Sequence, residues 1–361
     1  MTSRIVLPTI LTCLLLISSS TQIGGCSMRC SFSNKQSPLI DVSSSASVSN
    51  LYAPATGWSV EKLDTAKNYA NEIGSAAIVI LHNDTLVAEW GNTNKKINSH
   101  SIRKSLLSAL YGIAIDNSQL DISMDLLALG LDDENPRLDT IEKSATVQQL
   151  LQSRSGIYHP AAYETPQAVN TRPTRGSHLP GQYWYYNNWD FNALATIFEN
   201  HTQLSIGQAF DDWIAKPIGL SDYRKDDVVY VYEQESIHPA YPFYITARDL
   251  ARFGLLFLNK GTWNGEQIIP QTWIEASTTA YSEANPQASP TLSYGYMWWI
   301  RGDGSYYAQG TGGQRLYIDP IRQLIISHRT DTCTTGEAYH PKAFEVNRLI
   351  ELVIDAHPDN Q

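Results

Sequence analysis

The chain has 361 residues, of which 42% are hydrophobic, so it is long enough to fold around a substantial buried core. Its formal net charge is −10, with 26 Lys and Arg residues against 36 Asp and Glu residues. This balance offers no electrostatic basis for gripping a phosphate backbone or an anionic lipid surface, which argues against a nucleic-acid-binding function.

The first 25 residues are typical of an export signal. Arg4 precedes an apolar run at residues 5–17, which is too short to cross a bilayer as a mature helix. The sequence IGGC that ends at Cys26 is similar to the lipobox of bacterial lipoproteins, in which the cysteine is acylated after cleavage. Cleavage after Ser20 would instead leave a soluble periplasmic protein. We therefore expect a bacterial cell-envelope location, either lipid-anchored through Cys26 or periplasmic.

Residues 26–57 are rich in Ser and Asn and lack periodic apolar positions, so they predict a flexible tether before a folded domain at residues 58–358. Of the four cysteines, Cys13 would be lost with the signal. An oxidising compartment would allow Cys30 and Cys333 to form a disulfide, although the sequence does not establish this pairing.

The domain is predicted to begin with a helix and a hairpin. A helix starts at Ser59, because apolar residues recur after it at helical spacing. Two apolar runs around Asn83-Asp84 then predict a β-hairpin. A second helix is expected over residues 101–116. The apolar positions of the first helix are Leu63, Ala66, Ala70 and Ile73.

From residue 117 to about residue 244, short helical patterns alternate with loops rich in Pro and Gly. A strong helix follows, in which Thr246 and Asp249 are spaced for a capping box and Gly261 lies just past the end. Tight turns then separate strand patterns at residues 294–301, 305–309, 315–318 and 323–328, which predict an antiparallel meander. Residues 341–356 predict a last helix that packs on this sheet.

This order of elements predicts an α/β (α+β) fold, in which an antiparallel sheet is flanked by N- and C-terminal helices. The sheet subdomain is expected to comprise about residues 58–116 and 272–358. A mostly helical subdomain, about residues 117–271, is inserted between its two parts.

Ser101 and Lys104 form a pair whose meaning depends on its surroundings. Such spacing arises about once by chance in a chain of this length, and Ser59 and Lys62 share it where a helix cap belongs. After Lys104, however, the sequence is so apolar that the helix must be nearly surrounded by protein. Burial lowers the pKa of an ammonium group, so Lys104 could act as a base towards Ser101, one helical turn away. The alternative is a capping serine beside a lysine that reaches solvent.

A second motif, LPGQYWYYNNWDFNAL, places Tyr186 and Asn188 in a Y-x-N pattern after Pro180-Gly181. Together with S-x-x-K and a Gly-rich strand turn near the C-terminus, it resembles the serine β-lactamase and penicillin-binding-protein superfamily. The chain is most similar to the branch of class C β-lactamase-like esterases and 6-aminohexanoate-dimer hydrolases, which implies a β-lactamase-like fold. Tyr185 with Asn187 is a competing register, but the spacing from Pro180-Gly181 favours Tyr186.

The third motif departs from the family pattern. Members carry K-T-G or H-x-G on a strand, and counting back from Asp319-Pro320 places this triplet at Ala308-Gln309-Gly310, without the cation. In β-lactamases and D,D-peptidases that cation helps to anchor a substrate carboxylate, so its loss argues against penicillin or D-alanyl peptides as the natural substrate. Arg315 either binds such a carboxylate instead or, as is more usual for arginine, reaches solvent.

The resemblance implies a serine hydrolase that forms a covalent acyl-enzyme with a small ester or amide. Ser101 would be the nucleophile, with Lys104 and Tyr186 as acid and base. The backbone N–H groups of Ser101 and Thr311 would form an oxyanion hole. No metal or organic cofactor is implied, and the sequence has no H-E-x-x-H or C-x-x-C pattern. It also has no G-x-S-x-G pattern that would suggest an α/β-hydrolase. The candidate substrate-binding residues are Asn188, Gly310, Tyr158, Trp184 and Trp298.

Two other functions stay open at this level. One is a β-lactamase or D,D-peptidase acting on β-lactams or peptidoglycan peptides. The other is a catalytically silent envelope protein that uses the pocket only for binding. The complete set of Ser101, Lys104 and Tyr186 argues against the silent protein, because a binding protein has no need of a desolvated lysine beside a serine.

Overall fold

The computed structural model describes residues 57–134, 136–285, 287, 290–333 and 340–360. Within these residues the main sheet has eight strands in the order β2-β1-β14-β13-β12-β11-β10-β9, all paired antiparallel. This topology confirms the predicted fold class. The pairing of β1 with β14 joins the N-terminal hairpin to the C-terminal meander. The strands of the sheet are β1 Ala77–His82, β2 Thr85–Gly91, β9 Ser282–Asn285, β10 Leu292–Tyr294, β11 Trp299–Arg301, β12 Tyr306–Gly310, β13 Gln314–Asp319 and β14 Leu324–Arg329.

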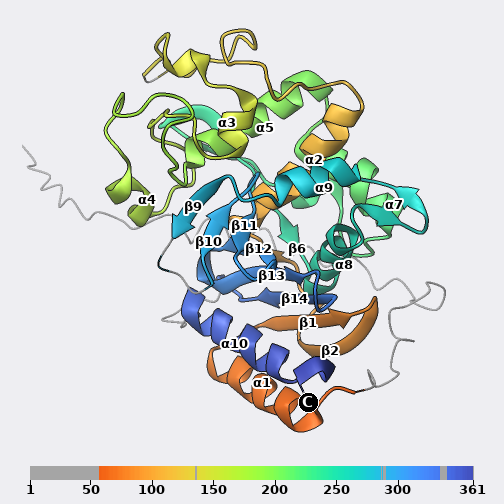
Figure 1. Cartoon of the computed structure of the whole chain (residues 1–361). Helices are drawn as coiled ribbons and strands as arrows, with labels where there is room; N and C mark the ends of the chain where they lie inside the picture. The colour runs from red at the N-terminus through yellow and green to blue at the C-terminus, as the bar shows by residue number, and fades with distance from the viewer. Residues whose placement is uncertain (1–56, 135, 286, 288–289, 334–339, 361) are drawn as a thin grey trace, which may run out of the picture. The chain divides into compact units, whose positions relative to one another are not determined.

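Helices cover both faces of this sheet (Figure 1). Helices α1 and α10 contact each other on one face, where the apolar side of each packs into one core with β1, β13 and β14. Helix α8 contacts β1, β13 and β14 on the other face, and α2 contacts β12 and β13. The helices are α1 Val60–Glu72, α2 Ile102–Asp116, α3 Val147–Leu151, α4 Pro166–Thr171, α5 Asn188–Thr202, α6 Ile206–Phe210, α7 Lys216–Ile218, α8 Ala247–Leu258, α9 Gln271–Ser277 and α10 Ala343–Asp355.

Helix α1 begins where the sequence predicts. The Ser59 hydroxyl accepts a hydrogen bond from Lys62 N at 3.4 Å, so Ser59 is the helix cap and this S-x-x-K pair is structural. Lys62 Nζ donates to Asp355 O at 2.9 Å, and Ser59 N donates to Ala356 O at 3.1 Å. The start of the domain is therefore fastened to the end of α10.

The predicted strand at residues 294–301 is wrong, because the chain turns in its middle. Gly295 N donates to Trp298 O, which makes a tight turn between β10 and β11. Distant carbonyls hold this turn: Tyr296 N donates to Ser277 O and Met297 N donates to Leu151 O. A Cβ on Gly295 would lie 2.2 Å from Ser277 O, so only glycine fits there.

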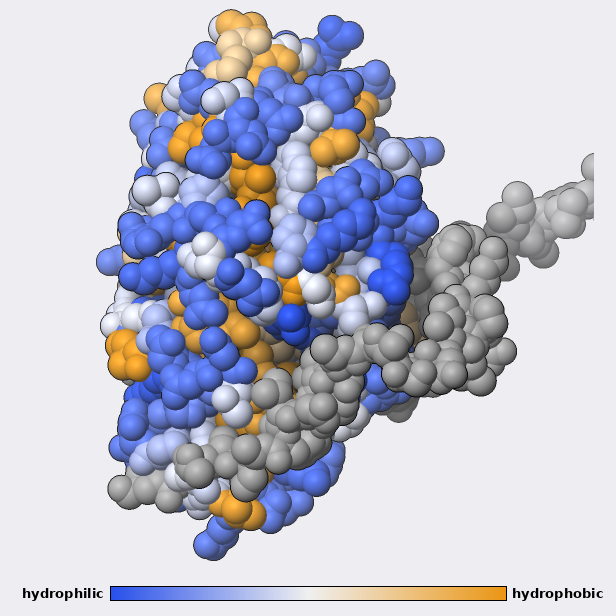
Figure 2. Space-filling view, turned by 90° about the vertical axis from the view of Figure 1, so that its right-hand side faces the viewer, coloured by the Kyte–Doolittle hydropathy of each residue, from blue (hydrophilic) through white to orange (hydrophobic). Residues whose placement is uncertain are grey.

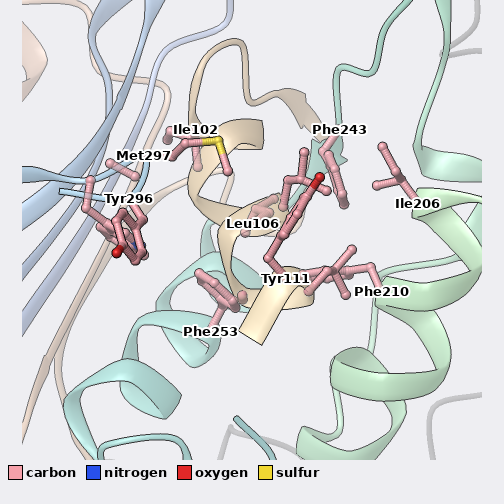
Figure 3. Packing of buried hydrophobic residues seen from close by; sticks show 14 of the residues in the cluster. Ile102, Leu106, Tyr111, Ile206, Phe210, Phe243, Phe253, Tyr296 and Met297 are labelled. Carbon is pink, nitrogen blue, oxygen red and sulfur yellow. The ribbon is translucent and has the colours of Figure 1, made fainter. Parts of the chain in front are cut away.

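Helix α2 is the apolar centre of the molecule, as the sequence predicts. Ile102, Leu106 and Tyr111 extend from it into a cluster that includes Phe243 and Phe210 (Figure 3). Along its length every residue from position 102 to position 114 is buried. Lys104 is therefore carried into the interior.

Helix α8 has only half of its predicted capping box. The Thr246 hydroxyl accepts a hydrogen bond from Asp249 N at 3.1 Å. The Asp249 carboxylate instead accepts from Asp222 N and Tyr223 N at 3.1 and 2.8 Å. Burial, followed by the charge of Asp222, raises the pKa of Asp249 to about 6. The carboxylate thus ties α8 to the preceding loop.

The segment between α2 and α8 contains helices α3 to α7 separated by long loops, and it also contains short strands that the sequence pattern did not reveal. The predicted boundary after residue 271 assigned α8 to the helical subdomain, yet α8 packs on the main sheet. The division into two subdomains stays a prediction. The remaining short strands are β3 Ile97–Asn98, β4 Val231–Glu233, β5 Ser236–Ala240, β6 Tyr244–Ile245, β7 Thr262–Trp263 and β8 Glu266–Gln267.

The surface is mainly hydrophilic with separate apolar patches on the face shown in Figure 2. No helix in the described ranges combines the length and apolar character that a membrane span requires. The predicted signal peptide, the tether and Cys26 lie outside the described residues. Cys333 is disulfide-bonded, and its predicted partner Cys30 also lies outside them, so this pairing stays a prediction.

His328, on β14, gives the fold a predicted sensitivity to acid. Its Nδ1 lies 2.7 Å from Gly313 O and its Nε2 lies 2.8 Å from Ser75 Oγ. Burial lowers the pKa of His328 to about 4, below the value of 6.5 for a free histidine. The unfolded chain then takes up this proton more readily than the folded chain, so stability present above pH 6.5 is lost as the pH falls towards 4.

Replacing His328→Gln should flatten the stability profile in this range, because glutamine keeps a hydrogen-bond donor and acceptor but does not titrate. The free energy of unfolding, measured with urea from pH 7 to pH 4, should fall less in the variant than in the wild type, by up to about 3 kcal/mol. Equal losses in the two proteins would show that His328 does not control this acid sensitivity.

Candidate active site

Ser101 lies immediately before α2 and does not act as a helix cap. Its backbone is already helical, with φ −75° and ψ −7°, and its hydroxyl makes no capping hydrogen bond. Lys104 is only 1% exposed, so it does not reach solvent. The interpretation of this pair as a cap beside a solvent-seeking lysine is therefore wrong, in contrast to Ser59 and Lys62.

The Lys104 amino group joins the two sequence motifs. Its Nζ lies 3.0 Å from Ser101 Oγ, 2.7 Å from Tyr186 OH and 2.9 Å from Asn188 Oδ1. A neutral amine can donate two hydrogen bonds and accept one, and an ammonium can donate three. The three oxygen atoms can therefore serve either protonation state, with the Asn188 oxygen as acceptor in both.

The electrostatic surroundings favour the neutral amine. Burial lowers the pKa of Lys104 well below its usual value, and the nearby charge of Arg103 lowers it further, whereas Glu164 has the opposite effect. Burial raises the pKa of Tyr186 to about 12, against the effects of a hydrogen bond with Ser101 and of the Arg103 charge. These shifts favour a neutral amine and a phenol beside the Ser101 hydroxyl.

The structure brings Tyr186, and not Tyr185, to Lys104. Tyr185 OH donates to Ala168 O at 2.7 Å. Asn187 caps α5, where its Oδ1 accepts from Trp189 N at 3.3 Å. Because Asn187 is used as the cap, the first residue of the helix is Asn188. The register that pairs Tyr185 with Asn187 would therefore place neither side chain at the amino group.

The end of β12 lies against the segment that leads into Ser101. A Cβ on Gly310 would lie 2.4 Å from Ser99 O and 3.0 Å from His100 Cβ, so only glycine allows this approach. Thr311 follows at an exposed position and opens a short 3₁₀ turn, Thr311–Gly313. In the described part of the chain, neither Ser101 N–H nor Thr311 N–H donates to another residue. Both groups remain available for a ligand oxygen.

The three aromatic residues predicted to line the pocket have different surroundings. Trp298 is fully buried and packs on Phe257 with ring centroids 4.6 Å apart, which favours a core role. Tyr158 is also buried, and its hydroxyl lies 3.1 Å from His178 Nδ1. Trp184 is half-buried.

Trp184 belongs to an aromatic group that reaches Tyr186. Its ring centroid lies 6.0 Å from that of Trp299, which stacks on Tyr186 at 5.5 Å. Trp184 also lines a cavity of about 440 Å³, which Ser101, Lys104 and Tyr186 do not line. The cavity residues are Arg154, Thr171, Gln182, Tyr183, Trp184, Tyr185, Ser282, Glu283 and Ala284.

Both predictions for Arg315 are wrong. It is 1% exposed, and its guanidinium donates to Asn347 Oδ1 at 3.1 Å and to Gln309 Oε1 at 2.7 Å. It also lies 4.1 Å from the centroid of the Tyr307 ring. Asn347 belongs to α10, so the side chain points towards the face that α10 covers. Arg315 neither reaches solvent nor replaces the missing cation.

Arg103 is the residue that the sequence reasoning missed. It is 1% exposed and adjacent to Lys104. The same apolar run that predicted the burial of Lys104 also follows Arg103, so the signal was present.

Among the described residues, no group of three His, Cys, Asp or Glu side chains could hold a metal ion.

Comparison with known proteins now adds to this geometry. The family model described as beta-lactamase matches residues 61–332, which is most of the chain. The chain belongs to the beta-lactamase family. Its large antiparallel sheet with flanking helices agrees with the beta-lactamase-like fold.

The chain is similar to proteins that are named as hydrolases or esterases. A 6-aminohexanoate-dimer hydrolase from Paenarthrobacter ureafaciens is 35% identical over 89 residues, which covers 22% of this chain and only 23% of that relative. A solved homologue of this hydrolase from Bacillus anthracis has 25% identity and a TM-score of 0.61, with 80% of each chain covered. A family VIII carboxylesterase has 15% identity and a TM-score of 0.58, over 82% of this chain and 97% of its own. The last likeness concerns the fold alone.

Replacing Gly310→Ala should disturb the position of Ser101. The added methyl group would press on Ser99 and His100, and a displacement of about 1 Å can slow a reaction on the order of 100-fold. The measurement is the rate at which a fluorophosphonate labels Ser101, with circular dichroism to check the fold.

Gly302→Ala is the matched control, because a Cβ there would lie 3.5 Å from its nearest neighbour, Thr291 N. Its labelling rate should equal that of the wild type. Equally fast labelling of Gly310→Ala would show that the contact with β12 does not hold the nucleophile in place.

Proposed function

We propose that this chain is a serine hydrolase that acts on a small ester or amide through a covalent acyl-enzyme. The observation that carries the proposal is the placement of the Lys104 amino group within hydrogen-bond distance of both Ser101 Oγ and Tyr186 OH. The names of the relatives, a 6-aminohexanoate-dimer hydrolase and a carboxylesterase, support hydrolysis of an amide or an ester.

In the proposed acylation, Ser101 Oγ attacks the substrate carbonyl carbon and its proton moves to the neutral Lys104 amine. Lys104 suits this role because burial and the Arg103 charge lower its pKa. Asn188 Oδ1, at 2.9 Å, orients the amine by accepting one of its hydrogen bonds. The Ser101 and Thr311 N–H groups would stabilise the negative oxygen that forms.

Tyr186 is the proposed acid for the leaving group. Its pKa of about 12 keeps the hydroxyl protonated until the leaving oxygen or nitrogen becomes basic. As Tyr186 gives up its proton, Lys104 at 2.7 Å can return one to it. In deacylation a water molecule attacks the ester, its proton passes to this pair, and Ser101 Oγ recovers a proton as the acid leaves.

The proposed substrate has no carboxylate group that a cation in the third motif would have to bind. Ala308 stands where relatives have lysine or histidine, and its side chain is buried in the core. Arg315 is held by Asn347 and Gln309 and does not replace that cation. We therefore place β-lactams and D-alanyl peptides second, and nitrocefin turnover at a rate comparable with simple esters would reverse this order.

We propose in addition that the enzyme works in the bacterial cell envelope, exported by the signal at residues 1–25 and attached to lipid through Cys26. The disulfide at Cys333 supports an oxidising compartment. Mass spectrometry of the membrane fraction would detect the acylated N-terminal peptide, and a mature chain that begins after Ser20 would contradict the attachment.

The decisive experiment is intact-mass spectrometry after treatment with a fluorophosphonate, in which the serine oxygen displaces fluoride from phosphorus. The wild type should gain one adduct, and Ser101→Ala should gain none. Lys104→Met should label more slowly by about 100-fold or more, because the general base is lost. Ser59→Ala is the control, since it alters the structural S-x-x-K pair and should label like the wild type.

A folded wild type without any adduct would contradict the hydrolase proposal and favour a silent binding protein. An adduct that persists in Ser101→Ala would assign the reactive serine elsewhere. Once Ser101 is confirmed as the labelled residue, a screen of small esters and amides would define the acyl group.

A further inference from the structure

Arg103 is a buried cation without a counterion. No carboxylate in the described ranges lies within ion-pair distance of its guanidinium. Its Nη2 donates to Asn192 Oδ1 at 3.0 Å, whereas Nε and Nη1 have no partner among the described residues. The centre of the guanidinium lies 4.4 Å from the Tyr241 ring centroid. It also lies 6.0 Å from the Tyr163 ring centroid. The charge is therefore stabilised by one amide oxygen and two aromatic rings, without a carboxylate.

This arrangement is a poor way to stabilise a fold. An isolated charge loses its hydration on burial, and one hydrogen bond and two cation–π contacts recover only part of that loss. An apolar side chain of similar length would fill the same space without the cost. The contacts of Arg103 thus give no sufficient structural reason for a positive charge at this position.

The groups around Arg103 point to an effect on the candidate site. Its charge is the largest influence on the Lys104 pKa after burial, and it acts in the same direction. It also lowers the pKa of Tyr186, against the effect of burial. Both effects favour the forms that a serine hydrolase needs, a neutral amine and a phenol that can give up its proton.

Other charged and titratable groups do not cancel this influence. Glu164 raises the Lys104 pKa, but its carboxylate is ion-paired with Arg172 and accepts a hydrogen bond from Ala161 N. Two further tyrosines and one carboxyl group surround Tyr186 and its neighbours. They are Tyr241, Tyr294 and Asp190, each with a pKa raised by burial towards its neutral form.

We propose that Arg103 is a positioning residue that favours neutral Lys104 and ionisable Tyr186 through its uncompensated charge. Arg103 does not touch the substrate in this proposal. It rests on the proposed hydrolase function for its purpose, but its effect on Lys104 can be measured directly. The charge, and not the shape, of the side chain is what matters.

The test measures the Lys104 pKa by NMR in protein labelled with ¹³C at the lysine ε-carbons, with Lys104→Met to assign the signal. Arg103→Gln removes the charge and keeps a donor for Asn192, so the Lys104 pKa should rise by about one unit or more. Arg103→Lys keeps the charge and should leave it near the wild-type value. Arg103→Met serves as a second neutral variant if the glutamine variant fails to fold.

Arg329→Met is the matched control. Arg329 is also fully buried, but it donates to Gln314 Oε1 and to two backbone carbonyls at 2.8 Å each. Its charge is not among the causes of the Lys104 shift. In the folded Arg329→Met variant, the Lys104 pKa should stay at the wild-type value.

Two outcomes would overturn the inference. In one, the neutral Arg103 variants leave the Lys104 pKa unchanged. In the other, Arg103→Lys shifts it as much as the neutral variants do. Fluorophosphonate labelling of the same proteins tests the proposed function separately. A wild type that is never labelled would contradict the hydrolase proposal, whereas the NMR titration would still test the effect of Arg103 on the Lys104 pKa.

Discussion

The candidate site depends on keeping one amino group out of water without a carboxylate partner. The apolar sequence after Lys104 forces α2 into the centre of the molecule, and the amine can lie there only because neutral oxygens surround it. Other elements are arranged around this constraint. The cap at Asn187 begins α5 so that Asn188 reaches the amine, and Gly310 lets β12 approach the serine segment.

The chain has the fold of the beta-lactamase family, and the proposed difference from its members lies in the third motif. Lys104 and Tyr186 come from segments that pack against the main core, whereas the triplet Ala308-Gln309-Gly310 ends strand β12. The triplet predicted from the family pattern has Ala308 where members carry a cation, and this small side chain packs into the core. Proteins that share one fold can differ in substrate class through single positions of this kind.

The sequence predicted those features that depend on local patterns. Helix spacing and capping placed α1, and the apolar run after Ser101 correctly indicated a buried lysine. The sequence pattern failed where contacts with residues far away in the sequence determine the local conformation. The turn at Gly295 is set by Ser277 O and Leu151 O, which no local pattern contains. Arg315 points to the same side of β13 as Tyr317, two residues later, because alternate residues of a strand share a face. Tyr317 packs in the core cluster with α10, and the Arg315 side chain therefore also points towards α10.

The fastening of α1 to α10 has a consequence for the topology of the domain. Lys62 Nζ lies 2.9 Å from Asp355 O and 3.5 Å from Asn360 O, so the two ends of the described domain meet at one pole. A short linker could join these ends, and a circularly permuted chain could open instead at an exposed loop. Ser101 and Tyr186 would remain in place, since neither belongs to the joined elements. A partner fused directly after the last described residue would lie beside α1 and α10, on the opposite face of the sheet from α2 (Figure 1).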